Sequence, residues 1–520
     1  MIQLSSLPRI CVALGCEESA HLQRMAQSER ASGERFLELR LDMLDRPESG
    51  IPVIRRVMRR HPRTVIIATC RRTPNGGRFG GSIDEQAEVL GRALSAGAAL
   101  VDVEIETAQA ERPMLERFRG SSRVIVSYHD FEKTPALGPV LSRLKKIPAD
   151  IYKIATTVRK PSDNMRLLDL ASGNQETPLV TLGMGEAGAP SRILGPSRGS
   201  IFGFGMPDAR ASAGKRGGPP AAAQRPGPHA ATAPGQISAA LMRDRYQVQK
   251  RKSSSAVYGV IASPVGHSMS PALHNRAFQS KRIDAVYLPF LVEPGQLADF
   301  FRVARELPVA GFSVTIPHKL GVRRHLHSVD RLAQRIGAVN TVYRRAGKLW
   351  GTNTDAIGVT APLEKRTPLK KATVLIAGNG GAARGAIFAT KATGARVTLT
   401  GRNPRRVRAL ARACGVEAIE REKLTDRHFD ILIHTTPLGM SPNVDNCFFS
   451  DDIPADLVFD MVYNPLETLL LKKARLAGKQ TISGLEMFLE QAAAQFEIWT
   501  GETAPRTVMK KTVLQALGAA

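Results

Sequence analysis

Eight short apolar runs alternate with helix-length segments along the first half of the chain. They begin at Ile10, Phe36, Thr64, Ala99, Arg123, Ile151, Pro178 and Ser200. Strands that alternate with helices predict parallel βαβ units. Eight such units in about 240 residues match the size of a closed (β/α)8 barrel. An open doubly wound sheet is the alternative, but no glycine-rich turn follows the first run.

This pattern stops between residues 205 and 231, where Pro, Gly, Ala and Arg dominate and no apolar period survives. We expect a disordered insertion there. A helical spacing resumes at Ile237, residues 250–256 are typical of a polar linker, and a new strand begins at Val257. The first predicted domain therefore spans residues 1–249.

Length and composition indicate a globular protein with more than one core. The chain has 520 residues, of which 43% are hydrophobic and 23% charged. No apolar stretch is long enough for a transmembrane helix, and strand-like sequence already begins at Ile10. We therefore expect a cytoplasmic protein with no membrane partner.

The net charge of +26 indicates an attraction for anions. Lys and Arg are spread along the chain without a DNA-binding signature, so we expect anionic small molecules rather than nucleic acid as partners. The five cysteines form no CxxC pair, which argues against a disulfide framework and a zinc site, and no metal is expected. A monomer and a homodimer both remain open.

Ionisable side chains occur at the ends of most predicted strands. The active site of a (β/α)8 barrel lies at the carboxyl ends of its strands. Those positions hold Glu38, Arg40, Arg71, Glu104, His129, Lys153 and Arg192. The set indicates an anionic substrate, a proton shuttle and an amine nucleophile.

Lys153 is the most informative of these residues. It interrupts the apolar stretch "DIYKIATT", and lysine is rarely buried unless paired. Apolar walls and neighbouring cations would favour the neutral amine that a nucleophile needs. His129, with a pKa near its ordinary value, could take and return a proton. Taken singly, Lys153 could extend to solvent, His129 could be structural, and Glu38 and Arg40 could form an ordinary ion pair.

Several motifs resemble the type I 3-dehydroquinate dehydratases across most of residues 8–248. They are "ELRLD", "ATCRRTPNGG", "VDVE", "VSYHDFEKTP", "YKIA", "SR" at Ser191 and "TAPGQI" at Thr232. The resemblance implies that Lys153 forms a Schiff base with the substrate ketone, that His129 is the general acid and base, and that Glu104 assists it. The residues that it implies for holding the substrate are Glu38, Arg40, Arg71, Arg192, Thr232 and Gln236. In this family the loop of residues 232–236 closes over the substrate, and Thr232 replaces the usual serine.

A strand, a glycine-rich turn, a helix and a second strand follow one another from Thr373 to Thr400. Gly378, Gly380 and Ala383 fit the pattern GxGxx(G/A), which lets a pyrophosphate approach a helix N-terminus. Arg402 and Arg406 follow the second strand, where an acidic residue would bind NAD. This favours the 2′-phosphate of NADP, although both could be solvated loop arginines.

The second half resembles the shikimate dehydrogenases from Val257 to the C-terminus. The motifs are "SPVGHSMSPALHN", "GFSVTIPHK", "GAVNT", "GTNTDAIG", "HTTPLGM", "DMVYNPLET" and "GLEMFLEQAA". The resemblance implies a substrate-binding domain of residues 257–362 and 485–520 and a Rossmann NADP-binding domain of residues 363–484. Lys319 and Asp355 would transfer a proton while NADPH delivers a hydride to the ketone.

The same resemblance implies two further sets of residues. The substrate set is Ser268, Ser270, Thr315, Asn340, Asp355, Tyr463 and Gln491. The cofactor set is Gly378, Asn379, Gly380, Gly381, Ala382, Ala383, Arg402, Arg406, Thr435, Met461 and Gly484. Asn379 replaces a small residue of the family's turn, and Gly401 replaces the asparagine that usually precedes the arginines.

Together the two resemblances imply a bifunctional enzyme of the shikimate pathway. It would dehydrate 3-dehydroquinate to 3-dehydroshikimate and then reduce that product to shikimate with NADPH. Fusion would raise the local concentration of the second active site. One alternative is a quinate-sensing transcriptional regulator built from the same domain pair, which would be expected to have lost catalytic residues. The other is a quinate dehydrogenase that uses NAD in the second half.

Overall fold

The computed structural model describes residues 2–208, 231–424, 426–449 and 452–518. The chain divides into two compact units, Met1–Val309 and Ala310–Ala520. The domain borders expected at residues 250–256, 362 and 484 differ from this division and stay predictions. Most of the expected insertion, residues 209–230, lies outside the described residues.

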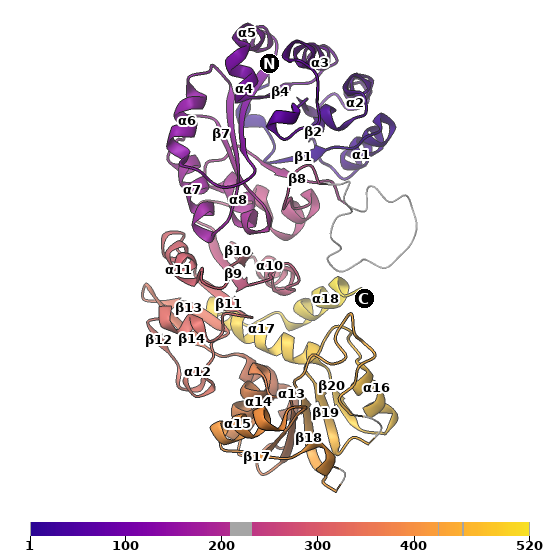
Figure 1. The fold of residues 1–520 in the computed structure, drawn as a ribbon, viewed down its shortest axis with the longest axis vertical. Coiled ribbons are helices and arrows are strands. Elements are labelled where there is room, and N and C mark those ends of the chain that lie inside the picture. The colour runs from indigo at the N-terminus through magenta and orange to yellow at the C-terminus, as the bar shows by residue number, and fades with distance from the viewer. Residues whose placement is uncertain (1, 209–230, 425, 450–451, 519–520) are drawn as a thin grey trace. The chain divides into compact units, whose positions relative to one another are not determined.

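A nearly closed parallel barrel forms the larger part of the first unit (Figure 1). Its strands in the described residues are β1 (Ile10–Leu14), β2 (Phe36–Arg40), β3 (Val65–Thr69), β4 (Leu100–Glu104), β5 (Arg123–Asp130), β6 (Ile151–Thr157), β7 (Leu179–Met184) and β8 (Gly203–Gly205). They are paired in the order β7-β6-β5-β4-β3-β2-β1-β8. Ile201 N donates to Leu179 O, which brings the chain before β8 against β7. The predicted barrel is confirmed, although β8 begins at Gly203 rather than at Ser200.

Helices lie between the strands of the barrel because each connecting segment has one apolar face. They are α1 (Ser19–Ala31), α2 (Ile51–Arg60), α3 (Ile83–Ser95), α4 (Ile105–Ala110), α5 (Arg112–Arg119), α6 (Leu137–Lys145), α7 (Pro161–Ser172) and α8 (Ala189–Leu194). Helix α3 shows how the sequence sets a helix start. Ser82 Oγ accepts from Glu85 N, and the Glu85 carboxylate accepts from Ser82 N.

The inside of the barrel is filled by apolar side chains at its amino end. One layer consists of Phe36, Ile67, Leu100, Ile125, Ile151 and Val180, all with 0% exposure. Phe202 and Phe204 pack against the same cluster, and the Phe202 ring meets the Phe36 ring edge to face. Since successive strand residues alternate between the two faces, the residues two and four positions later also point inward, toward the carboxyl end.

The first unit continues beyond the barrel with β9 (Ala256–Ala262), α10 (Ser270–Ser280), β10 (Ala285–Leu291) and α11 (Leu297–Glu306), and β9 pairs parallel with β10. The expected polar linker at residues 250–256 is in part buried. Arg251 donates from Nη1 to Ala285 O and Asp284 Oδ1, and its own carbonyl accepts from Arg9 Nη1. Arg251 therefore fixes part of this segment against its neighbours, and the linker expected there stays a prediction.

The second unit begins with the strands β11 (Gly311–Val314), β12 (Ser328–Val329), β13 (Thr341–Arg345) and β14 (Lys348–Thr352). Strand β13 pairs antiparallel with both β11 and β14, and β12 pairs parallel with β14. The helices α12 (Arg331–Ile336) and α13 (Asp355–Glu364) accompany them. The unit ends with α17 (Gly484–Thr500) and α18 (Arg506–Ala516).

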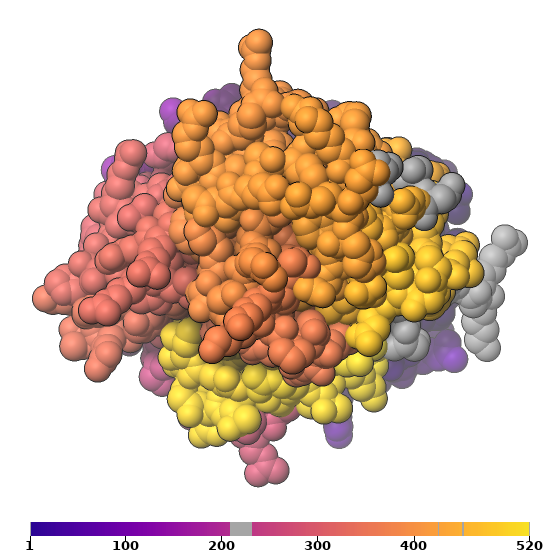
Figure 2. All heavy atoms as spheres, turned by 90° about the horizontal axis from the view of Figure 1, so that it is seen from below, coloured from indigo at the N-terminus to yellow at the C-terminus, as the bar shows by residue number. Residues whose placement is uncertain are grey.

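A parallel sheet of Rossmann type occupies the rest of this unit. Its elements are β15 (Thr373–Ala377), α14 (Gly381–Ala392), β16 (Arg396–Thr400), α15 (Pro404–Cys414), β17 (Glu417–Ala418), β18 (Phe429–His434), β19 (Ala455–Asp460), α16 (Leu469–Leu476) and β20 (Gln480–Ile482). The strand order β17-β16-β15-β18-β19-β20 reverses direction between β15 and β18. Ligands of such sheets bind at the point of reversal. Figure 2 shows the surface of this part in orange beside the yellow C-terminal helices.

No helix in the described ranges is long and apolar enough to cross a membrane.

Candidate active sites

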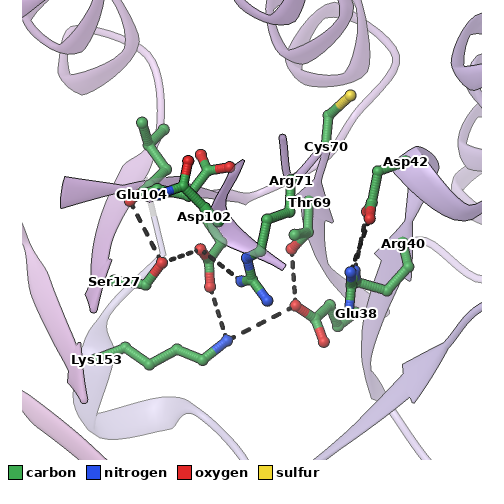
Figure 3. Close-up of polar contacts among 12 residues, drawn as sticks. Glu38, Arg40, Asp42, Thr69, Cys70, Arg71, Asp102, Glu104, Ser127 and Lys153 are labelled. Carbon is green, nitrogen blue, oxygen red and sulfur yellow. Dashed lines mark hydrogen bonds and ion pairs between the residues drawn. The ribbon is translucent and has the colours of Figure 1, made fainter. Parts of the chain in front are cut away.

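Two layers of polar side chains follow the apolar layer toward the carboxyl end of the barrel, and Figure 3 shows those around Asp102 and Lys153. The lower layer lies two residues beyond the apolar one and consists of Glu38, Thr69, Asp102, Ser127 and Lys153. The upper layer lies two residues further and consists of Arg40, Arg71, Glu104 and His129. The barrel thus brings together predicted site residues from five different strands or strand ends.

Lys153 points into the lower layer and is 4% exposed. Its Nζ lies 2.8 Å from Asp102 Oδ2, 3.9 Å from Glu38 Oε1 and 4.2 Å from the centre of the Phe204 ring. The burial predicted from the sequence is confirmed. The predicted surroundings were incomplete, because two carboxylates as well as apolar walls and cations face the amine.

Asp102 is the anion at the centre of this layer. Its carboxylate accepts hydrogen bonds from Lys153 Nζ, from Ser127 Oγ at 2.6 Å and from Arg71 Nη2 at 3.2 Å. Burial alone would raise the pKa of Asp102, but the positive charges of Lys153 and Arg71 hold it below its ordinary value. Asp102 is therefore a fixed negative charge that orients the side chains around it.

His129 is the last of the β5 residues that point into the barrel. It lies beside the Phe131 ring, with 6.0 Å between the ring centres. Its pKa is well below the ordinary value because of desolvation and the nearby charges of Arg71 and Lys153. The expectation of an unperturbed histidine is therefore wrong. A neutral imidazole is the form that accepts a proton.

The Glu104 carboxylate accepts hydrogen bonds from the segment that follows β3. Its Oε1 accepts from Arg72 N at 2.6 Å and its Oε2 accepts from Gln86 Nε2 at 2.8 Å. Burial raises the pKa of the Glu104 carboxyl. These contacts point to a supporting role, and the assistance to His129 that the resemblance implied stays a prediction.

Arg192 is a buried guanidinium without a carboxylate partner among the described residues. It lies in α8, is 2% exposed, and donates from Nη2 to Pro234 O at 3.0 Å. Its Nε and Nη1 have no hydrogen-bond partner in the described structure. Burial lowers the pKa of Arg192 to about 10. This side chain can bind an anion.

The predicted residues Thr232 and Gln236 contact each other. Gln236 Oε1 accepts from Thr232 N at 2.8 Å, and Gln236 Nε2 donates to Thr232 Oγ1 at 3.0 Å. Gly235 has φ +69°, and a Cβ there would lie 2.2 Å from Gly185 O, so only glycine fits this close approach. The segment of residues 232–236 is therefore a compact turn held against the loop after β7.

Lys319 and Asp355 form the centre of a second polar cluster, within the second unit. Lys319 Nζ lies 2.6 Å from Asp355 Oδ2, and Asn340 Nδ2 donates to Asp355 Oδ1 at 2.7 Å. Asn340 Oδ1 in turn accepts from Thr354 N at 2.8 Å. Asp355 is the first residue of α13, where a negative charge is favourable. The predicted catalytic pair is thus in direct contact.

The other predicted substrate residues lie at element ends or on helices. Thr315 follows β11, and its carbonyl accepts from His318 N in the turn that leads to Lys319. The Tyr463 ring stacks on Phe488 of α17, with 5.2 Å between the centres, and Gln491 lies one turn further along that helix. Ser268 and Ser270 belong to the first unit, where Ser270 N donates to Ser268 Oγ.

The glycine-rich turn joins β15 to α14 as expected. Gly378 has φ +135°, and a Cβ there would lie 2.2 Å from Thr435 Oγ1. A Cβ at Gly380 or Gly381 would contact nothing within 4 Å, so this face of the turn has room for a ligand. The rest of the predicted set continues into α14: Asn379 before it, and Ala382 and Ala383 in its first turn.

The other predicted cofactor residues lie just after strands or in the first turns of helices. Arg402 and Arg406 are exposed beside the start of α15. Thr435 follows β18 and donates to Ala377 O at 2.9 Å. A Cβ at Gly484 would lie 2.3 Å from Met461 O, so these two residues approach each other closely.

Several residues with a place in these sites were not named from the sequence. Asp102, Ser127 and Thr69 complete the lower layer, and their signal was the spacing of two from the apolar residues Leu100, Ile125 and Ile67. In the second unit, Nδ1 of the buried His434 shares a hydrogen bond with Asp460 Oδ1 at 2.9 Å, directly before Thr435 and Met461.

Among the described residues, no group of three or more His, Cys, Asp or Glu side chains is arranged to hold a metal ion.

Comparisons with known proteins assign each half to a family. The model described as type I 3-dehydroquinase matches residues 10–253. The models described as shikimate dehydrogenase substrate binding domain and shikimate 5'-dehydrogenase C-terminal domain match residues 260–342 and 484–514.

The chain is also similar to individual proteins. The chain is 35% identical over 499 residues to the chloroplastic bifunctional 3-dehydroquinate dehydratase/shikimate dehydrogenase of Arabidopsis thaliana, covering 91% of this chain and 79% of the relative. It is 42% identical over 268 residues to a shikimate dehydrogenase (NADP(+)) of Oleidesulfovibrio alaskensis, covering 50% and 95%. A crystal structure of shikimate 5-dehydrogenase from Thermus thermophilus with NADP(H) and shikimate is 33% identical, covers 50% of this chain and 99% of its own, and has a TM-score of 0.47.

Proposed function

Because this chain belongs to the family of bifunctional 3-dehydroquinate dehydratases/shikimate dehydrogenases, we propose that Lys153 and Lys319 are the catalytic lysines of its two reactions. The chain is an enzyme of the shikimate pathway, with a dehydratase in its first half and a dehydrogenase in its second. The observation that carries the residue assignment is the placement of each lysine Nζ against a carboxylate, 2.8 Å from Asp102 and 2.6 Å from Asp355.

In the proposed dehydration, Lys153 leaves its ion pair, loses a proton and attacks the ketone carbon of 3-dehydroquinate. An imine forms and one water leaves. The imine withdraws electrons, so His129 can take a proton from the neighbouring carbon and return it to the hydroxyl that departs as water. A further water hydrolyses the imine and frees 3-dehydroshikimate and the amine. The lowered pKa of His129 supports its role as the base.

The substrate carboxylate is proposed to bind Arg192. Its Nε and Nη1 are buried and unpartnered in the described residues, and a carboxylate is the group that a guanidinium binds best. Glu38 and Arg71 are proposed to bind hydroxyl groups of the substrate, and Thr69 Oγ1 orients Glu38 by donating to it at 2.8 Å. Thr232 and Gln236 would act through the segment of residues 232–236, which we propose closes over the bound substrate.

In the proposed reduction, Lys319 Nζ donates a proton to the oxygen of the ketone, and Asp355 holds that ammonium in place. Asn340 fixes the Asp355 carboxylate through its own hydrogen bond. Thr315, Tyr463 and Gln491 of the second unit are proposed to bind the substrate. For Ser268 and Ser270 the substrate-binding role that the resemblance implies stays a prediction.

The cofactor proposed for this half is NADP(H), which supplies a hydride to the ketone carbon when bound. The open face at Gly380 and Gly381 fits a pyrophosphate at the start of α14. The backbone amides of Ala382 and Ala383, in the first turn of α14, would donate to it. Arg402 and Arg406 would hold the 2′-phosphate, while Thr435, Met461 and Gly484 would line the nicotinamide pocket. The name of the Oleidesulfovibrio relative, a shikimate dehydrogenase (NADP(+)), supports this cofactor.

A coupled assay tests the two roles together: the protein is mixed with 3-dehydroquinate and NADPH, and nicotinamide absorbance is followed. Absorbance should fall, and borohydride added during turnover should leave a stable adduct on Lys153. An adduct on another lysine would overturn the Lys153 assignment. Failure to oxidise NADPH with 3-dehydroshikimate, while NADH or quinate is used, would favour the quinate dehydrogenase alternative.

Two expectations stay predictions. The cytoplasmic location is one, and the name of the Arabidopsis relative places that protein in the chloroplast. The other expectation is that the partners are small anionic substrates and that the protein is a monomer or a homodimer.

A further inference from the structure

The last residues of two neighbouring strands, His434 and Asp460, form a buried pair at the carboxyl edge of the Rossmann sheet. They are register partners in the parallel pair of β18 and β19, and they are 1% and 0% exposed. Nδ1 of His434 lies 2.9 Å from Asp460 Oδ1. A carboxylate can only accept, so this nitrogen carries a proton and donates it. Strand β18 lies beside the point where the strand order reverses, which is where such sheets bind ligands.

Hydrogen bonds extend from this pair in both directions. Nε2 of His434 lies 2.5 Å from Thr436 Oγ1. In a neutral ring this nitrogen accepts, so the Thr436 hydroxyl donates to it and accepts from Leu438 N at 3.3 Å. On the other side, Asp460 Oδ2 accepts at 2.6 Å from the hydroxyl of Thr468, the N-cap residue of α16. The network therefore runs from α16 through both strand ends into the loop after β18, and satisfied buried networks of this kind rigidify their surroundings.

The pair lies directly before two residues of the predicted nicotinamide pocket. Thr435 follows His434 in the chain, and Met461 follows Asp460. Met461 N donates to His434 O at 3.0 Å, and Val462 N donates to Asp460 Oδ1 at 3.1 Å. The chain on either side of Met461 is thus held by the pair. The hydroxyl contact with Nε2 holds the residue after Thr435 in the same way, so one pair fixes both walls of the pocket.

We propose that His434 is a positioning residue of the dehydrogenase, which fixes the distance between the two walls of the nicotinamide pocket through Asp460 and Thr436. The inference rests on the proposed function, because NADP(H) and this pocket are themselves proposed there. The 2′-phosphate of the cofactor is assigned to Arg402 and Arg406, which follow a different strand, β16. His434 therefore serves the nicotinamide end of the cofactor and not its adenosine end.

The Thr436 hydroxyl offers the least disruptive test, because Thr436 is only half-buried and valine has its shape without the hydroxyl. In the full-length protein, Thr436→Val should weaken NADPH binding about fivefold, as expected for the loss of one hydrogen bond. Calorimetry without substrate measures it. Binding of adenosine 2′,5′-bisphosphate, which carries the 2′-phosphate but no nicotinamide, should be unchanged. Thr436→Ser keeps the hydroxyl and should bind both ligands as the wild type does.

His434→Asn tests the ring itself. The shorter amide can still donate to Asp460 but cannot reach Thr436, so this variant should also weaken NADPH binding and spare the bisphosphate. The matched control is Thr503→Val, the same chemical change at an exposed position between α17 and α18, which should alter neither affinity. If His434→Asn binds neither ligand, its sheet has not folded, and Thr436→Val decides the question.

Unchanged NADPH binding in Thr436→Val overturns the proposal. So does an equal loss of both ligands, because the network would then support the sheet as a whole. A loss in Thr436→Ser as large as in Thr436→Val excludes the hydroxyl. If His434→Asn binds NADPH as the wild type does while Thr436→Val does not, the hydroxyl acts on the cofactor directly and the proposal is wrong. A wild-type protein that binds neither ligand would contradict the proposed cofactor, and the inference with it.

Discussion

Lys153 Nζ and Asp102 Oδ2 lie 2.8 Å apart inside the barrel, so the proposed nucleophile is held by an ion pair. Asp102 also accepts from Ser127 Oγ and Arg71 Nη2, and all of these side chains are buried. The pair keeps the amine in one place before substrate arrives, and substrate binding has to replace it.

Asp102→Asn should therefore slow dehydration without affecting reduction. The amide cannot accept from Lys153, Arg71 and Ser127 together, and a misplacement of about 1 Å can cost about 100-fold in rate. We expect kcat for 3-dehydroquinate to fall about 100-fold, measured from the absorbance of the enone product. Shikimate oxidation by the same sample is the control. A kcat within threefold of wild type would show that the anion does not orient the site.

Replacement of the two lysines should separate the activities. Lys153→Ala should abolish dehydration and leave reduction of 3-dehydroshikimate intact, and Lys319→Ala should do the reverse. The reason is that each lysine pairs with a carboxylate of its own, Asp102 or Asp355. Loss of both activities in either variant would mean that the sites are not independent.

The pH dependence of dehydration should reflect the lowered pKa of His129. Desolvation and the charges of Arg71 and Lys153 disfavour the imidazolium, so His129 stays neutral at a pH where a free histidine is half protonated. We expect kcat/KM to hold its plateau as the pH falls through about 6.5, the ordinary value for histidine. A decline that is already half complete at that pH would contradict the assignment of His129 as the base.

Stability of the first unit should fall as the pH rises, because of Glu29. This residue of α1 is 2% exposed, and burial raises its pKa to about 7. The unfolded chain releases the proton near the ordinary value of 4.5, so the stabilising contribution is complete below that pH and is lost as the pH rises through about 7.

Glu29→Gln should remove this dependence. Its amide oxygen can still accept from Asp208 N, which donates to Glu29 Oε1 at 3.1 Å. We expect the free energy of unfolding at pH 8.5 to rise by up to about 3 kcal/mol relative to wild type, with a smaller difference at pH 5. Chemical denaturation at the two pH values measures it, and an equal difference at both would contradict the prediction.

Asp299 should stabilise the barrel although it lies after the dehydratase sequence. Its Oδ2 accepts from Ser162 N at 2.8 Å, in the first turn of α7, and Gln296 Nε2 donates to Arg159 O in the preceding loop. Asp299→Ala should lower the free energy of unfolding of the first unit by about 1 kcal/mol. Asp299→Asn keeps an acceptor oxygen and should cost less. Equal unfolding midpoints for wild type and Asp299→Ala would exclude a contribution.

Much of the barrel could be predicted because parallel strands are buried on both faces and therefore form apolar runs. The strand beginning at Ile151 was recognised in this way, and Lys153 stood out within it. Motif resemblance then identified both halves, which the comparisons confirm. Asp102 escaped notice because one aspartate in "VDVE" looks like an ordinary break in the apolar run; the spacing of two from Leu100 was the available signal.

Partners distant in sequence could not be predicted. Asp42 stands in the same motif as Arg40. Only the fold shows that the Asp42 carboxylate accepts from Nε and Nη2 of Arg40, while Nη1 of Arg40 donates to Thr232 O. Arg251 looked like part of a polar linker and is buried against Ala285. The resemblance implied that Glu104 assists His129, and only the folded chain shows that the Glu104 oxygens accept from Arg72 N and Gln86 Nε2.

The amino-acid sequence by itself determined the alternation of strands and helices, the two families and the identity of the lysines, since each depends on residues that are close together in the chain. Only the tertiary structure decided the charge environment of those residues. Electrostatic interactions depend on distance and burial in space, and the barrel brings carboxylates from two separate strands to 2.8 Å and 3.9 Å from Lys153 Nζ.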